Sequence, residues 1–354
     1  MEELPVQAIA NTIAQSFAVG LKGPSPEPEE LELITQVGIG AVVVFSRNIS
    51  SPLGIWEFNY GLRRAAAEAG KPPLMVMVDQ EGGVVARLRE PFTCAPGFDE
   101  LGASASEQQM YEHGLKVGRE LKAAGFTWNL APVVDVHLHP DGVMARRSLG
   151  SDPHRVARLA AAYTRGLRAG GVMACAKHFP GLGRTTADTH HRPAVINAGL
   201  EELEQVELVP FRAVVDAGAE GVMVSHAIVP ALDPDRPGSL CPQVTGWLRR
   251  ELGGEVVVLS DDMEMAAATQ GGSVAQAAVE AYLAGCDMVL VCSRAEEAVG
   301  AIDELTRMAS EGSLPLGVIK DKWARILRLK SSLAPLPPPA QELMELLGGG
   351  DGGD

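Results

Sequence analysis

The sequence predicts an α/β fold, a single-domain (β/α)8 TIM barrel over residues 1–334. Eight short apolar runs, rich in Val, Leu and Met, recur along its 354 residues, and a stretch with helical apolar spacing follows each of them. The runs are continuous rather than alternating, as is typical of parallel strands buried on both faces. Eight β-then-α units favour a closed barrel over an open, doubly wound sheet.

The expected elements can be placed along the chain from these patterns. The strands are expected at 15–20, 41–45, 74–79, 128–135, 172–177, 221–225, 256–261 and 287–292. The clearest helices are expected at 106–124 and 152–169, and later helices at 274–284, 295–310 and 318–333. Asp152 is expected to cap the second of these, with Pro153 at its first position. Residues 335–354, rich in Pro and Gly, are expected to form a flexible C-terminal tail.

A Rossmann-like sheet is the alternative fold. Such a sheet binds its dinucleotide at a GxGxxG turn that opens a helix, and no such motif follows the first expected strands. Gly38 and Gly40 precede a strand instead. This alternative is therefore the weaker one, and no cofactor is expected.

Composition narrows the classes of function. The chain carries 45 acidic and 30 basic residues, a net charge of −15, which suits neither nucleic acid nor anionic membrane as a partner. Five widely spaced cysteines without a CxxC motif argue against a disulfide framework or a zinc knuckle. The N-terminus reads unlike a secretion signal, and no apolar run reaches the length of about 18 residues that a membrane span needs. We expect a cytoplasmic protein, and a closed barrel can stand as a monomer.

Polar side chains gather where the expected strands end. Six strands end in such groups: Ser46-Arg47-Asn48, Asp79-Gln80-Glu81, Asp135-Val136-His137, Lys177-His178, Ser225-His226 and Asp261-Asp262. The carboxyl ends of barrel strands share one rim, where barrel enzymes carry their active sites. The sequence therefore predicts one polar site on an apolar scaffold.

Two places in the sequence have a specific chemical interpretation. Asp188 lies two residues before His190, close enough in a turn to fix the histidine tautomer and to raise its pKa, which suits general acid/base catalysis. The alternative is a solvated loop histidine beside an acid.

A carboxylate such as Asp261 is costly at a strand end unless it is paired or functional. Because successive strand side chains alternate, only one of Asp261 and Asp262 is expected to face the site, and Asp262 could instead cap a helix.

With these motifs together, the sequence resembles glycoside hydrolase family 3, in its β-N-acetylhexosaminidase branch of the NagZ type. The resemblance runs from about residue 15 to about residue 329. It is carried by Val44-Phe45-Ser46-Arg47-Asn48-Ile49, Asp79-Gln80-Glu81-Gly82-Gly83, Leu130-Ala131-Pro132-Val133-Val134-Asp135, Arg147-Ser148-Leu149-Gly150, the block 177–190, and Ser260-Asp261-Asp262-Met263. That family also has a (β/α)8 barrel.

The resemblance implies roles for individual residues. Asp261 matches the nucleophile, His190 the acid/base and Asp188 its dyad partner. The positions that hold the N-acetylglucosamine hydroxyls match Asp79, Arg87, Arg147, Lys177 and His178. The implied reaction is retaining removal of terminal β-linked N-acetylglucosamine from peptidoglycan-derived muropeptides, during cell-wall recycling, through a covalent glycosyl-aspartate. No metal or cofactor is implied, and the substrate is a small sugar or muropeptide.

The sequence departs from the family pattern at three positions, and alternatives stay open. Leu182 replaces a loop histidine, Val84 an arginine and Leu149 a phenylalanine, which bears on aglycone preference and loop motion. A histidine base repels an anionic acceptor less than a carboxylate does, so an N-acetylglucosaminide phosphorylase is one alternative. A metal-dependent amidohydrolase barrel is another, because His137-x-His139 and the other polar groups include its ligand types. A non-catalytic sugar-binding barrel is the third.

Overall fold

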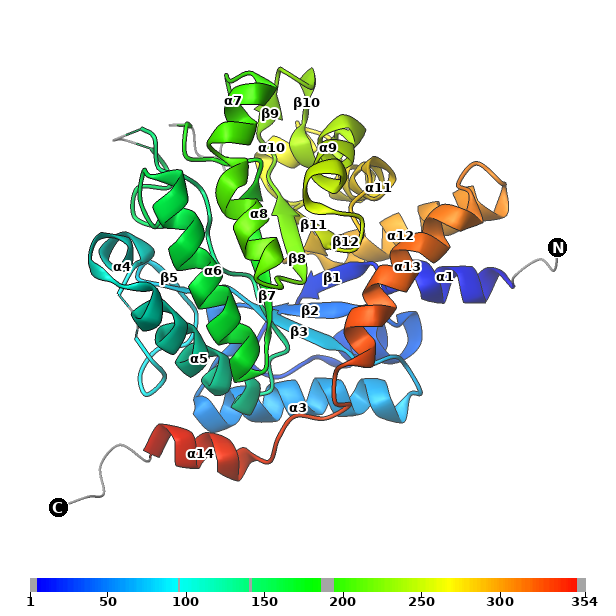
Figure 1. Cartoon of the computed structure of the whole chain (residues 1–354). Helices are drawn as coiled ribbons and strands as arrows, with labels where there is room; N and C mark the ends of the chain where they lie inside the picture. Colours follow the sequence, from blue (N-terminus) through cyan, green and yellow to red (C-terminus); the bar gives the residue numbers. More distant parts are fainter. Residues whose placement is uncertain (1–4, 95, 140–141, 186–193, 349–354) are drawn as a thin grey trace.

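A computed structural model of the chain describes residues 5–94, 96–139, 142–185 and 194–348 (Figure 1). Within these residues eight parallel strands close into a barrel, in the order β1-β12-β11-β8-β7-β6-β3-β2. The barrel strands are β1 (Phe17–Gly20), β2 (Ala41–Val44), β3 (Met75–Val78), β6 (Trp128–Asn129), β7 (Met173–Phe179), β8 (Gly221–Val224), β11 (Val257–Asp262) and β12 (Met288–Val291). The first strand pairs with both the second and the last, so the predicted (β/α)8 barrel is confirmed.

Helices surround the barrel (Figure 1). They are α1 (Val6–Ala14), α2 (Pro28–Glu32), α3 (Pro52–Glu68), α4 (Phe98–Ser104), α5 (Glu107–Ala123), α6 (Pro153–Gly170), α7 (Leu200–Gln205), α8 (Leu208–Asp216), α9 (Pro242–Leu252), α10 (Ala266–Thr269), α11 (Val274–Ala284), α12 (Ala295–Ser310), α13 (Leu316–Ser331) and α14 (Ala340–Gly348). The expected start of α6 is confirmed, because the Asp152 side chain accepts a hydrogen bond from His154 N and Pro153 is the first helical residue. None of the described helices combines the length and apolar character that a bilayer crossing requires.

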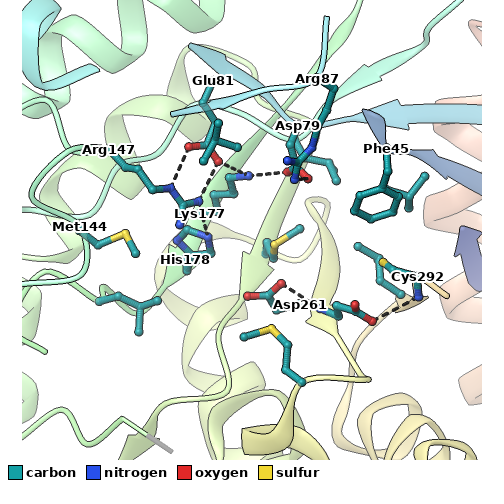
Figure 2. Close-up of a pocket in the computed structure, with 18 of the residues that line it drawn as sticks. Phe45, Asp79, Glu81, Arg87, Met144, Arg147, Lys177, His178, Asp261 and Cys292 are labelled. Atoms are coloured by element: carbon teal, nitrogen blue, oxygen red, sulfur yellow. Dashed lines mark hydrogen bonds and ion pairs between the residues drawn. The ribbon is translucent and has the colours of Figure 1, made fainter. Parts of the chain in front are cut away.

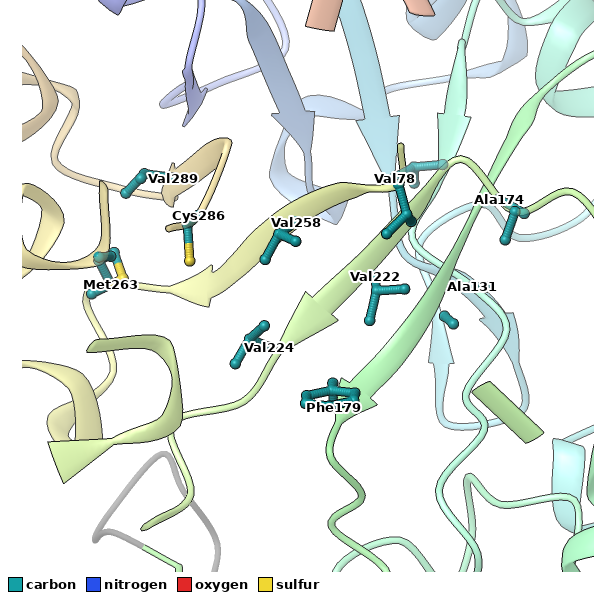
Figure 3. Packing of buried hydrophobic residues seen from close by; sticks show 14 of the residues in the cluster. Val78, Ala131, Ala174, Phe179, Val222, Val224, Val258, Met263, Cys286 and Val289 are labelled. Carbon is teal, nitrogen blue, oxygen red and sulfur yellow. The ribbon is translucent and has the colours of Figure 1, made fainter. Parts of the chain in front are cut away.

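The barrel strands are buried on both faces, which explains their continuous apolar sequence. Inward-facing side chains such as Val43, Met77 and Trp128 fill the barrel, while their neighbours pack outward against the helices. Figure 3 shows part of the outward layer, including Val222 and Val258. A Cβ on Gly221 would lie 2.4 Å from the Trp128 ring, so the interior tolerates only glycine there.

Two short antiparallel hairpins extend strand ends beyond the barrel. β4 (Gln80–Gly82) and β5 (Val85–Ala86) pair directly after β3, and β9 (Ile228–Val229) and β10 (Asp233–Pro237) pair after β8. The first hairpin turns at Gly82 and Gly83, whose φ angles of 110° and 55° favour glycine. It thereby returns the chain over the carboxyl end of β3.

Two expected segments differ from the structure. Residues 128–135 were expected as one strand, but β6 ends at Asn129, and beyond Pro132, which has no amide hydrogen to donate, an isolated bridge joins Val133 to Lys177. Residues 335–354 were expected as a loose extension; the structure describes them as far as residue 348, and within that part α14 packs beside α3 and α5 and buries Leu343. Leu343, Leu346 and Leu347 follow helical spacing, a signal that the high Pro and Gly content of the segment obscured.

Candidate active site

A cavity of about 370 Å³ opens at the carboxyl ends of the strands. Its volume lies within the range of about 300–1,000 Å³ that small-molecule sites occupy. Its charged and polar lining comes from Asp79, Glu81, Arg87, Arg147, Lys177, His178, Asp261 and Asp262 (Figure 2). The six sequence-predicted site residues in the described part of the chain are thus brought to one cavity. Asp188 and His190 lie outside the described residues.

Several elements contribute these side chains. Asp79 follows β3, Glu81 lies on β4 and Arg87 follows β5, so the hairpin places three charged groups at one side of the cavity. Lys177 and His178 are consecutive residues of β7. Phe45, Met144, Leu182, Met223 and Met265 belong to the apolar part of the lining.

A continuous row of ion pairs crosses the cavity wall. Asp79 lies between two cations, with Arg87 Nη2 at 3.2 Å and Lys177 Nζ at 2.7 Å. Glu81 lies between Lys177 Nζ at 2.7 Å and the guanidinium of Arg147, whose Nη2 and Nε donate at 2.8 and 2.9 Å. Each buried charge in the row is compensated by a neighbour, as burial of ions requires (Figure 2).

The pKa values of Glu81 and Lys177 keep both groups charged. Burial would raise the pKa of Glu81, but Lys177 and Arg147 outweigh burial and hold that pKa well below its usual range. Burial would likewise lower the pKa of Lys177, but Asp79 and Glu81 outweigh it and raise that pKa. The row is therefore a fixed array of charges that can hold hydroxyl groups.

His178 is held by a carboxylate that lies beneath the cavity. Asp135, whose side chain is fully buried, meets His178 Nδ1 at 2.8 Å and accepts the amide hydrogens of His178 and Leu182. His178 Nε2 lies 3.3 Å from Arg147 Nη2. The sequence predicted Asp135 as a polar residue at a strand end, but it predicted no role for Asp135 or for Glu81.

Asp261 lies in β11 and faces the cavity. Burial would raise its pKa, but the neighbouring His178, His226 and Lys177, together with the amide hydrogen of Asp262, hold that pKa below its usual range. The Asp262 amide donates to Asp261 Oδ1 at 2.8 Å. Asp261 is therefore an ionised carboxylate, as a nucleophile must be.

Asp262 also lines the cavity, so the expectation that only one of the two aspartates faces it is wrong. The pairing register of β11 with β12 shifts between Leu259 and Asp262, which breaks the alternation of side chains. Asp262 Oδ1 accepts from Glu264 N and Cys292 N, and α10 begins only at Ala266, so Asp262 is not its cap. Burial raises the pKa of Asp262 to about 6.

Comparison with known proteins shows the family of the chain. The family model for the glycosyl hydrolase family 3 N-terminal domain matches residues 8–329. The chain belongs to glycoside hydrolase family 3. It is 36% identical over 266 residues to the β-hexosaminidase of Nitrosomonas eutropha, an alignment that covers 73% of this chain and 75% of that relative.

Solved structures of family 3 agree with this assignment. A fungal multi-domain family 3 β-N-acetylglucosaminidase superposes with a TM-score of 0.90 at 33% identity, over 96% of this chain but only 41% of that one. NagZ from Neisseria gonorrhoeae, solved with N-trifluoroacetyl-D-glucosamine, superposes with a TM-score of 0.79 at 28% identity, over 94% and 93% of the two chains. This family 3 chain is therefore a glycoside hydrolase of the β-N-acetylhexosaminidase kind, which decides against the amidohydrolase and non-catalytic alternatives.

Proposed function

We propose that this enzyme removes terminal β-linked N-acetylglucosamine from peptidoglycan-derived muropeptides, with retention of configuration. The observation that carries the proposal is an ionised carboxylate, Asp261, in a cavity walled by paired charges suited to sugar hydroxyls. The β-hexosaminidase name of the Nitrosomonas eutropha relative and the N-acyl-glucosamine ligand of the gonococcal NagZ support the sugar assignment. The muropeptide aglycone, the cytoplasmic location and the monomeric state rest on the sequence alone.

In the first step Asp261 attacks the anomeric carbon while the bond to the aglycone oxygen breaks. Protonated His190, oriented by Asp188, gives its proton to that oxygen, and a covalent glycosyl-aspartate remains. In the second step neutral His190 takes a proton from water as the water oxygen attacks the same carbon. The ester bond breaks, Asp261 regains its charge, and the sugar leaves with its original β configuration.

The charged wall would orient the sugar for this attack. Asp79 can accept hydrogen bonds from hydroxyls, whereas Arg87, Arg147 and Lys177 can only donate them. These groups are already locked to one another, so they need little reorganisation when the sugar arrives. His178, fixed by Asp135, adds a further hydrogen-bonding group at the same wall.

Product analysis tests the proposal directly. Purified enzyme is incubated with muropeptides and with chito-oligosaccharides side by side, and the products are identified by mass spectrometry. We expect free N-acetylglucosamine and the shortened muropeptide. Cleavage of chito-oligosaccharides alone would contradict the muropeptide assignment. The same reaction in phosphate and in phosphate-free buffer separates a hydrolase, which yields free sugar in both, from a phosphorylase, which yields sugar phosphate.

A further inference from the structure

Glu81 is the most enclosed acid of the cavity wall. Only 3% of its side chain is exposed, and its two oxygens accept three hydrogen bonds from two residues. Oε1 is shared by Lys177 and Arg147, and Oε2 is taken by Arg147 Nε. Both oxygens of the carboxylate are therefore engaged, and its geometry constrains where both cations lie.

We propose that Glu81 is a positioning residue that locks Lys177 and Arg147 into one unit, so that two sugar-holding groups from separate segments keep a common geometry. The inference rests on the proposed function in one respect, namely that Lys177 and Arg147 hold the sugar. Glu81 itself acts through them and does not contact substrate.

The position of Glu81 in the fold supports this role. The β4–β5 hairpin carries Glu81 over β3, whereas Lys177 comes from β7 and Arg147 from a turn between β6 and α6. The shared carboxylate links the side chains of all three segments at one point. A bidentate guanidinium–carboxylate pair is directional as well as strong, so it fixes the plane of Arg147 and not only its distance.

The charge of Glu81 matters as well as its shape. Lys177 is almost fully buried and is faced by Asp79, Glu81, Arg147 and Asp261. Of the two acids in direct contact with Lys177, Glu81 is the one shared with a second cation. Removal of its charge would leave Asp79 as the acid still in direct contact with Lys177, beside the uncompensated charge of Arg147, which lowers the pKa of Lys177.

The test is the kinetics of Glu81→Gln on whichever aryl glycoside the wild-type enzyme cleaves. We expect kcat/KM to fall about 10²-fold, the scale of a misplacement of about 1 Å, with a rise in KM. On an activated aryl glycoside, whose departure needs no proton from His190, we also expect the alkaline limb of the kcat/KM profile to move down by about 1–3 pH units as the pKa of Lys177 falls. A purely structural role would leave that limb in place. The choice of glycoside keeps the test valid if the N-acetylglucosamine assignment fails.

Two further variants separate geometry from charge and from folding. Glu81→Asp keeps the charge but is one methylene shorter, so it should lower kcat/KM while the alkaline limb stays near its wild-type position. If Glu81→Gln does not fold, Glu81→Asp still tests whether the geometry at this position matters. Glu120→Gln is the matched control, because Glu120 is equally buried but bonds Thr93 away from the cavity.

Coupling provides the final criterion. If Glu81 acts through Arg147, the loss from Glu81→Gln should be much smaller in an Arg147→Lys background than in the wild type. The proposal is overturned if Glu81→Gln and Glu81→Asp both match Glu120→Gln within twofold in kcat/KM. It is also overturned if the Glu81 and Arg147 losses simply multiply.

Discussion

Asp135 and His178 meet at 2.8 Å, between Oδ2 and Nδ1, in a place where the carboxylate has no contact with solvent. The same carboxylate accepts the amide hydrogen of Leu182 at 2.7 Å. One buried acid thus fixes both a cavity-lining imidazole and the turn that follows β7. This arrangement and the ion-paired wall lead to the following predictions.

Asp135→Asn should weaken both folding and substrate binding. The amide keeps one acceptor but turns its NH2 group toward the N–H donors of His178 or Leu182. We expect a loss of about 1–3 kcal/mol in the free energy of unfolding and a raised KM. Denaturant unfolding and steady-state kinetics check this. Asp152→Asn is the control, since asparagine caps a helix as well as aspartate does; equal effects of the two would contradict the prediction.

Asp261→Asn should abolish turnover, because an amide cannot attack the anomeric carbon. The loss in kcat should exceed the factor of about 10²–10⁴ that general acid/base groups contribute. Hydrolysis of an aryl N-acetylglucosaminide measures it. Asp262→Asn should cost less, since Asp262 is engaged with the backbone amides of Glu264 and Cys292. Near-normal cleavage by Asp261→Asn would show that Asp261 is not the nucleophile.

His190→Ala should slow the cleavage of substrates with poor leaving groups more than the cleavage of substrates with good ones. A poor leaving group needs a proton in the transition state, whereas an activated phenol does not. Pre-steady-state rates of the glycosylation step across a series of phenol glycosides provide the measurement. His154→Ala, at an exposed histidine of α6, is the control. An equal loss across the series would argue against an acid role.

Lys330→Met should change how stability depends on pH. Lys330 is fully buried and donates to Gly40 O and Pro73 O, and burial lowers its pKa from 10.5 to about 7. Between these values the unfolded chain binds more protons, so this lysine makes the free energy of unfolding rise with pH by up to about 1.4 kcal/mol per unit. Unfolding curves from pH 6 to 10 should show a flatter rise in the variant. The exposed Lys320→Met should keep the wild-type slope.

The regular parts of the fold follow directly from local sequence. The expected helices 274–284 and 295–310 coincide with α11 and α12, because their apolar spacing and flanking residues agree with the packing they meet. Most expected strands also match, since burial on both faces leaves a continuous apolar run. The clustering of Asp79, Lys177 and Asp261 then follows from barrel topology.

The features that the sequence did not predict depend on contacts between segments that lie far apart in the chain. Glu81 reads as a loop residue, and only the β4–β5 hairpin reveals that it lies between Lys177 and Arg147. The register shift in β11, which turns Asp262 to the cavity, arises from pairing with β12 and has no local signal. The docking of residues 335–348 depends on partners such as Trp56, whose Nε1 donates to Pro338 O.

The row of ion pairs in the cavity wall sets Asp79 and Glu81 against Arg87, Lys177 and Arg147, and the ionised Asp261 lines the same cavity. The surrounding molecule, by contrast, carries a net charge of −15. The association rate of an uncharged aryl glycoside should therefore not depend on ionic strength. A carboxylate-bearing peptide substrate would approach against a long-range repulsion that salt relieves over a screening length of about 10 Å at 0.1 M.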